Sequence, residues 1–245
     1  MYAAIATSFS ENAEGVERLI DFDRDVIDLM IASLEGLKKD VPLPMHSFNG
    51  RIDRLIHIIS GIRDHESLKS KYGTVCNQAV VLLVSHFASV LGDLFRNAVS
   101  ESLDSENNDA ILDEDLKLTF REIKDKNWNI RGSAGDLLIA KKDLTFQDMQ
   151  STVKAFDHYI GVQIERDQRV NNIILGQAAR HVIVHASARV TDRMVKQLVK
   201  VSPRSLKSSL ELGATLVFTK EEVLELKSEM VAFVAALVNK LETRK

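Results

Sequence analysis

The sequence predicts an all-α fold in a single helical-bundle domain, with at most one short strand pair near residues 214–218. Its 245 residues include only 11 Gly and 3 Pro, too few for a β-sandwich, which needs a turn about every 10 residues. The 45% apolar and 27% charged content is typical of a globular chain. Apolar residues recur at three- and four-residue steps, the period of a helix. Since we find neither an internal repeat nor a linker, residues 1–245 are expected to form one domain.

The N-terminal part predicts two helices, over residues 10–39 and 52–62. The first ends at Asp40, because the prolines that follow disfavour helical geometry in the residues before them. The apolar residues expected on its buried stripe are Val16, Leu19, Ile20, Val26, Ile27, Met30, Leu34 and Leu37. We interpret residues 1–70 as a helical extension of the core that follows.

The longest predicted helix runs from about Val75 to Leu103. Its expected core stripe is Val80, Leu83, Val84, Phe87, Val90, Leu91, Leu94 and Phe95. The longest apolar run, from Ala79 to Leu91, is interrupted by polar residues and falls short of the ~18 residues of a membrane span. No basic, signal-like segment begins the chain. These features predict a cytoplasmic protein that does not enter a membrane, and the lone Cys76 is expected to be a buried, unreactive thiol.

The second half of the chain alternates between irregular and helical patterns. Residues 104–150 are the least regular, with loops expected at 105–109 and around Trp128, Gly132 and Gly135, and a short helix over 113–124. Further helices are expected from Leu144 to Gly161 with Thr145 as its cap, over 163–185, and over 191–201. The last helix begins with a capping box, in which Thr219 and Glu222 satisfy each other's backbone N–H groups.

The net charge of −3 argues against a protein that coats nucleic acid non-specifically. The charge is nevertheless segregated. Residues 101–125 hold nine acids and three bases, whereas residues 180–208 hold seven bases and one acid. The basic stretch is either a solvated helix face or a patch that faces phosphate groups.

One cluster in the sequence carries candidate chemistry: Arg180, His181 and His185, at the start of the basic stretch. His181 and His185 are four residues apart and share a helix face, toward which the long Arg180 side chain can swing. An arginine fork grips phosphate oxygens, and a histidine can give or take a proton near neutral pH. Together they suffice for metal-free RNA cleavage, because the nucleophile, the ribose 2′-hydroxyl, is already part of the substrate.

The segment Arg180-His181-Val182-Ile183-Val184-His185 resembles the Arg-x4–6-His signature of the HEPN superfamily. The resemblance covers most of residues 75–240 and is closest to the RiboL-PSP-HEPN branch. It implies a helical fold and a metal-independent endoribonuclease without a cofactor, acting in toxin–antitoxin, abortive-infection or other defence systems. It also implies a homodimer in which two motifs face each other across one cleft.

The resemblance assigns a role to each motif residue. Arg180 would bind the scissile phosphate, His185 would be the general acid/base, and His181 would orient the motif. The basic residues that follow, Arg189, Arg193 and Lys196, are then candidates for RNA binding. Where the family commonly has Asn and Gly after its histidine, this chain has Ala186-Ser187-Ala188.

Three other interpretations remain open from the sequence. The chain could be a non-catalytic HEPN-type module that binds a nucleotide or a partner protein, such as an antitoxin or effector. His181 and His185 could be two ligands of a metal ion, although such a site needs a third or fourth ligand. The chain could also be a structural helical interaction protein whose basic stretch serves only solubility.

Overall fold

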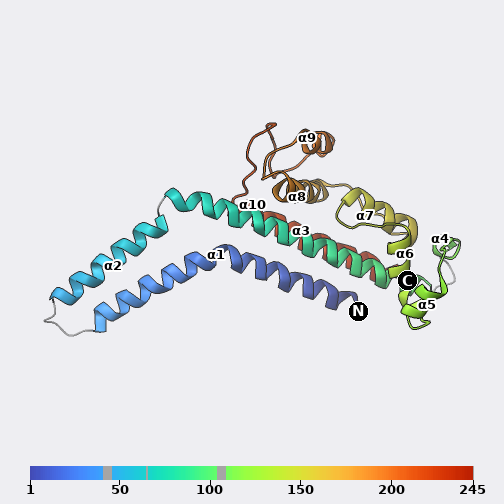
Figure 1. Ribbon diagram of the computed structural model, residues 1–245, viewed down its shortest axis with the longest axis horizontal. Coiled ribbons are helices and arrows are strands. Elements are labelled where there is room, and N and C mark those ends of the chain that lie inside the picture. Colours follow the sequence, from blue (N-terminus) through green and yellow to red (C-terminus); the bar gives the residue numbers. More distant parts are fainter. Residues whose placement is uncertain (41–45, 65, 104–108, 245) are drawn as a thin grey trace.

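The computed structural model describes residues 1–40, 46–64, 66–103 and 109–244, and within these it is all-α (Figure 1). Five helices are long: α1 (Tyr2–Asp40), α2 (His46–Asp64), α3 (Glu66–Ser102), α8 (Gln168–His185) and α10 (Lys220–Glu242). The shorter elements are α4 (Asp109–Leu112), α5 (Phe120–Asp125), the 3-10 turn η1 (Arg131–Ser133), α6 (Ala134–Lys141), α7 (Met149–Ala155), the π-helical turn η2 (Phe156–Ile160) and α9 (Asp192–Leu198). The predicted fold class is confirmed.

Helix α3 is the centre of the fold and packs against α1, α6, α8 and α10. Every residue of its predicted core stripe is buried. The Phe87 ring lies 6.0 Å from that of Phe9 on α1 and 5.5 Å from that of Phe233 on α10. Farther along, Phe95 contacts Phe156 at 5.5 Å between ring centroids. Rings of α3 therefore hold together segments that are far apart in the chain.

The segment Lys71–Ser102 of α3 is long and apolar enough to cross a membrane by length and composition alone. Counting unbroken apolar runs missed this, because two polar residues barely lower the average hydropathy of a long window. The largest apolar side chains of the segment, among them Phe87, Leu91 and Leu94, are fully buried against the rest of the fold. That is the position expected of the core helix of a globular bundle.

The prediction for the first helix is only half right. Val16 and Ile20 are buried as expected, but Leu19, Val26, Met30 and Leu37 are exposed. The reason lies in the architecture. The outer half of α1 contacts the bundle only at its start, where Asp21 pairs with Lys220 of α10 and Arg24 lies over the ring of Tyr72 on α3, and from there it runs beside α2 (Figure 1). We call residues 19–40 of α1 together with α2 the arm.

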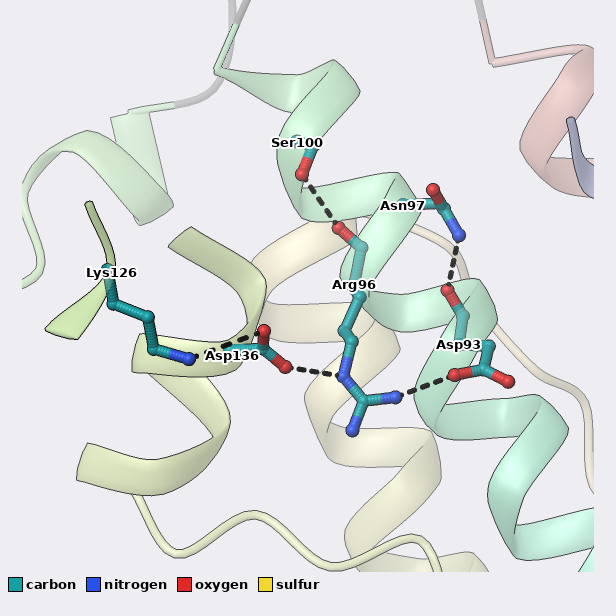
Figure 2. Close-up of polar contacts among 6 residues, drawn as sticks. All are labelled: Asp93, Arg96, Asn97, Ser100, Lys126 and Asp136. Atoms are coloured by element: carbon teal, nitrogen blue, oxygen red, sulfur yellow. Dashed lines mark hydrogen bonds and ion pairs between the residues drawn. The ribbon is translucent and has the colours of Figure 1, made fainter. Parts of the chain in front are cut away.

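The region around Gly132 and Gly135 was expected to be a loop, and this is wrong. It forms η1 and α6, which pack on the end of α3 (Figure 2). The Arg96 guanidinium bridges the two elements, donating to Asp136 on α6 and to Asp93 on α3, both at 2.7 Å. A Cβ atom on Gly135 would lie 2.7 Å from the Cα of Arg96, so the helices approach this closely only because residue 135 has no side chain.

Residues 214–218 are extended but form no strand among the described residues; a single bridge joins Thr215 to Arg189. Around this bridge the Leu216 N–H donates to the carbonyl of Ala188 at 2.7 Å, and the Val190 N–H donates to the carbonyl of Ala214 at 2.9 Å. The buried Asn77 side chain on α3 donates to the carbonyl of Leu216 at 2.8 Å and accepts from the N–H of Phe218 at 3.0 Å. The side-chain amide of Asn77 thus continues, toward α3, the backbone pairing that residues 188–190 begin.

Several helix ends differ from the sequence-based expectation. Asp148, not Thr145, caps α7, and α8 begins at Gln168 behind an Asp167 cap instead of at residue 163. The helix expected over 113–124 is confined to α5, which has its own capping box of Thr119 and Glu122. The capping box of α10 is confirmed. The proline-containing residues 41–44, expected to end the first helix, and residues 105–108 of the loop expected at 105–109 lie outside the described residues; Asp109 begins α4.

Candidate functional site

Helix α8 carries the candidate residues, and its first half fixes it in the bundle. Residues 170–179 of α8 are all buried. Gly176 allows close contact with α10, since a Cβ there would lie 3.0 Å from the Leu226 side chain. Two buried amides also anchor the helix: Asn171 donates to the carbonyl of Pro203 at 2.9 Å, and Asn172 donates to Glu229 at 2.7 Å. The polar residues at its C-terminal end therefore project from a rigid base.

A stripe of polar residues runs along one face of α8. Arg180 and His181 lie three and four residues after Gln177, and His185 lies four residues after His181, which places the four on one side of the helix. Gln177 is buried, Arg180 is half-buried, and the two histidines are exposed. The stripe thus leads from the core out to the solvent at the end of the helix.

The Arg180 guanidinium is tethered by two long contacts. Its Nε lies 3.4 Å from Oγ of Ser85 on α3, and one terminal nitrogen lies 3.4 Å from Oε1 of Gln147, which precedes α7. No carboxylate among the described residues forms an ion pair with it. Both partners are neutral and both distances are at the outer limit of a hydrogen bond, so most of the donor capacity of the guanidinium remains for an anion.

Arg180 and His181 open onto a hollow of about 470 Å³ between α8, α9 and the start of α7. Arg193 and Gln197 line it from α9, and Gln147 and Asp148 line it from the segment before α7. Gln177 forms part of its wall. The Gln177 side chain accepts from the N–H of Met149 at 2.9 Å, while its buried Nε2 has no hydrogen-bond partner. The hollow therefore presents two guanidinium groups, while the carboxylate that lines it, Asp148, is engaged with the N–H and hydroxyl of Ser151; this set of groups is suited to an anionic ligand.

The two histidine rings stand side by side, with 4.9 Å between their centroids and 50° between their planes. Partial desolvation and then the positive charges of Arg193, His185 and Arg180 lower the pKa of His181 below its usual value. His181 is therefore held in its neutral form, able to accept a proton. His185 does not line the hollow; it lies one turn further along the stripe, at the last residue of α8.

The other predicted RNA-binding residues are placed differently from one another. Arg193 lines the hollow. Lys196, one turn further along α9, forms an exposed ion pair with Asp192 at 2.6 Å, a contact worth little that a phosphate could replace. Arg189 is exposed and donates to the carbonyl of Gly213 at 3.3 Å. Of the three, the structure brings only Arg193 together with Arg180 and His181.

Part of the basic stretch has a structural role. Arg204 donates to the carbonyls of Val201 at 2.8 Å and Lys207 at 3.0 Å, which folds the segment after α9 on itself. Lys207 forms an ion pair with Glu222 at 2.6 Å. These two residues are therefore committed to the fold, and the free positive charge is concentrated near the hollow.

Sequence reasoning missed Gln177, Gln147 and Ser85. Gln177 could have been found from its spacing, since it lies three residues before Arg180 on the same helix face. Gln147 and Ser85 could not, because they belong to other elements and reach the site only through the packing of α3 and α7 on α8.

For the metal interpretation, the paired rings of His181 and His185 have no third ligand nearby: within the described ranges no group of three or more His, Cys, Asp or Glu could hold a metal ion. Comparison with protein-family models, with curated proteins and with solved structures finds no match to this chain. The assignment of a function thus rests on the chemistry of the site.

Proposed function

We propose that this protein is a metal-independent endoribonuclease whose site is built on the end of α8. The observation that carries the proposal is the hollow, which Arg180 and Arg193 line together with His181, whose pKa is lowered by desolvation and by these two positive charges. A phosphodiester is an anion that such a set can bind without a metal ion. The resemblance of the Arg180–His185 segment to the HEPN signature points to the same chemistry.

In the proposed reaction the ribose 2′-oxygen forms a bond to phosphorus while the bond from phosphorus to the 5′-oxygen breaks. The products end in a 2′,3′-cyclic phosphate and a 5′-hydroxyl. Arg180 binds the phosphate and stabilises the charge that builds up on its oxygens in the transition state. Arg193 contributes a second positive charge from the opposite wall.

Two protons must move in this step, and two imidazoles lie side by side to move them. His181 lines the hollow and is held neutral, so it accepts the proton of the 2′-hydroxyl. His185, with its ring 4.9 Å away, delivers a proton to the departing 5′-oxygen. Lys196 and Arg189, which lie outside the hollow, are the candidates for binding neighbouring phosphates of the RNA.

The setting proposed for this activity is a cytoplasmic toxin–antitoxin or defence system, in which an antitoxin or effector protein restrains the nuclease. The family resemblance also implies a homodimer, so a second copy of the chain is part of the proposed assembly. The alternative is a HEPN-type module that binds a nucleotide or a partner in the same hollow without cleaving RNA.

The test is cleavage of a panel of RNAs in the presence of EDTA by the wild type, His181→Ala and His185→Ala. Each histidine variant is expected to lose ~10²–10⁴-fold in rate, and Lys39→Ala, at the far end of the arm, is the matched control that keeps wild-type activity. Substrates with 2′-deoxyribose at the cleaved position should remain intact. RNA that binds but is never cut, with no effect of either substitution, would favour the non-catalytic module instead.

A further inference from the structure

The arm exposes apolar side chains that the fold of one chain does not use. Nine of the nineteen exposed large apolar side chains in the described part of the chain lie on it, each between 40 and 68% exposed. Apolar side chains scattered singly over a surface are common, but a contiguous apolar patch is uncommon on a monomer and marks an interaction site. The positions of these nine side chains around the arm therefore decide their meaning.

The register of the arm is fixed by two ion pairs between its helices. Lys38 of α1 binds Asp53 of α2 at 2.6 Å, and Arg63 of α2 binds Asp28 of α1 at 2.9 Å. The two helices are therefore antiparallel, with residue numbers that add up to 91 at the same height along both pairs. In this register Leu29 lies level with Ile62, and Leu37 lies level with residue 54, beside Leu55.

Each helix of the arm has two apolar stripes. One is exposed, and the other, which we call the seam, is less exposed and faces the partner helix of the arm. Most members of the exposed stripe precede a less exposed seam residue by one position: Leu19 before Ile20, Val26 before Ile27, Met30 before Ile31, Leu55 before Ile56, and Ile58 before Ile59. One residue along a helix corresponds to a rotation of about 100° around its axis. In both α1 and α2, the rotation from the exposed stripe to the seam therefore has the same sense when each helix is viewed from its N-terminus. Because the helices are antiparallel, equal senses place both exposed stripes on the same face of the arm.

The opposite face of the arm is charged, with both signs present. Asp53 is paired with Lys38, and Asp28 and Asp64 are paired with Arg63, whereas Asp21 faces the bundle and pairs with Lys220 of α10. A helix that lies on a membrane carries Lys and Arg on its polar face, where they attract anionic lipid. Since Lys38 and Arg63 are already paired with carboxylates, this face offers little attraction to such a surface, and the apolar face is suited to a protein and not to lipid.

We propose that the apolar face of the arm binds the same face of a second copy of this chain, so that two arms form an intermolecular four-helix bundle. Two helices with apolar stripes on one face make half of such a bundle, and a second arm supplies two more helices of matching length and pattern. With roughly 100 Å² exposed on each of nine side chains, the face is close to the ~800 Å² per partner that a stable interface buries. The apolar face of the arm shares no residue with the polar stripe of α8.

The test compares molar masses by light scattering at micromolar concentration for the wild type and for Leu29→Lys/Ile62→Lys. Both positions are exposed in the single chain, so the double variant should keep its helical circular dichroism. We expect its mass to be half that of the wild type. The control is Leu112→Lys/Leu212→Lys, which places two lysines at exposed apolar positions away from the arm and should leave the mass unchanged.

A second readout is thermal unfolding. A chain stabilised by its own copy unfolds at a temperature that rises with protein concentration, and this rise should be present in the wild type and absent from Leu29→Lys/Ile62→Lys. Equal masses for the wild type and the arm variant, or unfolding independent of concentration in both, would overturn the proposal. So would binding of the arm to anionic vesicles that the same double substitution abolishes while the mass stays unchanged.

Discussion

Arg193 reaches the candidate site from α9, and at the scale of single residues its charge is a main influence on His181. After desolvation, the charge of Arg193 is the largest cause of the lowered pKa of His181. The two residues belong to different helices, so their proximity is a consequence of the tertiary fold. Their interaction can be measured without any substrate.

We predict that Arg193→Gln raises the pKa of His181 toward its ordinary value, because one neighbouring positive charge is removed while the ring stays where it is. Titration of the imidazole signals by NMR measures this directly. Lys196→Gln is the matched control, since Lys196 is on the same helix, pairs with Asp192 and is not among the causes of the shift. An unchanged His181 pKa in Arg193→Gln would show that the two side chains do not meet.

The lowered pKa of His181 also has a consequence for stability. Between the folded and unfolded pKa values the unfolded chain binds a proton that the folded chain does not, so the free energy of unfolding rises with pH in that window and falls as the solution is acidified. His181→Gln should flatten this dependence, as followed by urea unfolding at a series of pH values around the ordinary histidine pKa. An identical pH dependence in the wild type and the variant would contradict the assigned shift.

At the scale of the elements, α6 packs on α3 through a position where only glycine fits. A Cβ on Gly135 would meet the Cα of Arg96 at 2.7 Å and its carbonyl oxygen at 3.0 Å, and neither backbone atom can move aside easily. The Arg96–Asp136 contact depends on the same approach. The irregular middle of the chain is thereby tied to the central helix.

We predict that Gly135→Ala lowers the free energy of unfolding by about 1–3 kcal/mol, the usual cost of overpacking. Gly15→Ala on α1 is the control with the opposite sign: no atom outside its own helix turn lies within 4 Å of the added Cβ, so it should stabilise by about 0.5–1 kcal/mol through helix propensity. Urea unfolding followed by circular dichroism measures both. Equal effects of the two substitutions would mean that α6 does not approach α3 as described.

The elements also show what the sequence could predict. Strong periodicity located α3, α8 and α10, and the Thr219–Glu222 capping box located the start of α10, because these signals are local. The residues of segment 214–218 favour extended geometry and so predict a strand, but their pairing with residues 188–190 is limited to one bridge. Beyond it the backbone is bonded by the side chain of Asn77, 139 residues from Leu216 along the chain. Gly132 and Gly135 indicated a loop because glycine usually does, whereas at Gly135 the missing side chain allows helix packing.

The candidate site likewise combines features that a local sequence pattern predicts with features that depend on tertiary packing. Arg180, His181 and His185 could be grouped from their spacing on one helix. The contribution of Arg193, the weak tethers from Ser85 and Gln147, and the hollow itself depend on how α3, α7 and α9 surround α8. No pattern within a single segment of the sequence encodes that arrangement.

At the scale of the whole molecule, the net charge of −3 conceals two regions of opposite character. Helices α8 and α9 lie on one side of α3, and α1 lies on the other (Figure 1). Residues 180–208 hold seven bases and one acid, whereas residues 10–40 of α1 hold nine acids and four bases. This segregation favours the approach of a polyanion on the side of α8 and α9 and leaves the arm to a second copy of the chain.

The central claim is that the end of α8 cleaves RNA, with Arg180 binding the phosphate that reacts. The most direct measurement is the single-turnover rate of RNA cleavage in EDTA for the wild type and Arg180→Ala, together with the chemical identity of the product ends. We predict 2′,3′-cyclic phosphate and 5′-hydroxyl ends, formed ~10²–10³-fold more slowly by Arg180→Ala, which should retain the circular dichroism of the wild type. Wild-type protein that leaves every RNA intact, or equal rates for the two proteins, would contradict this account.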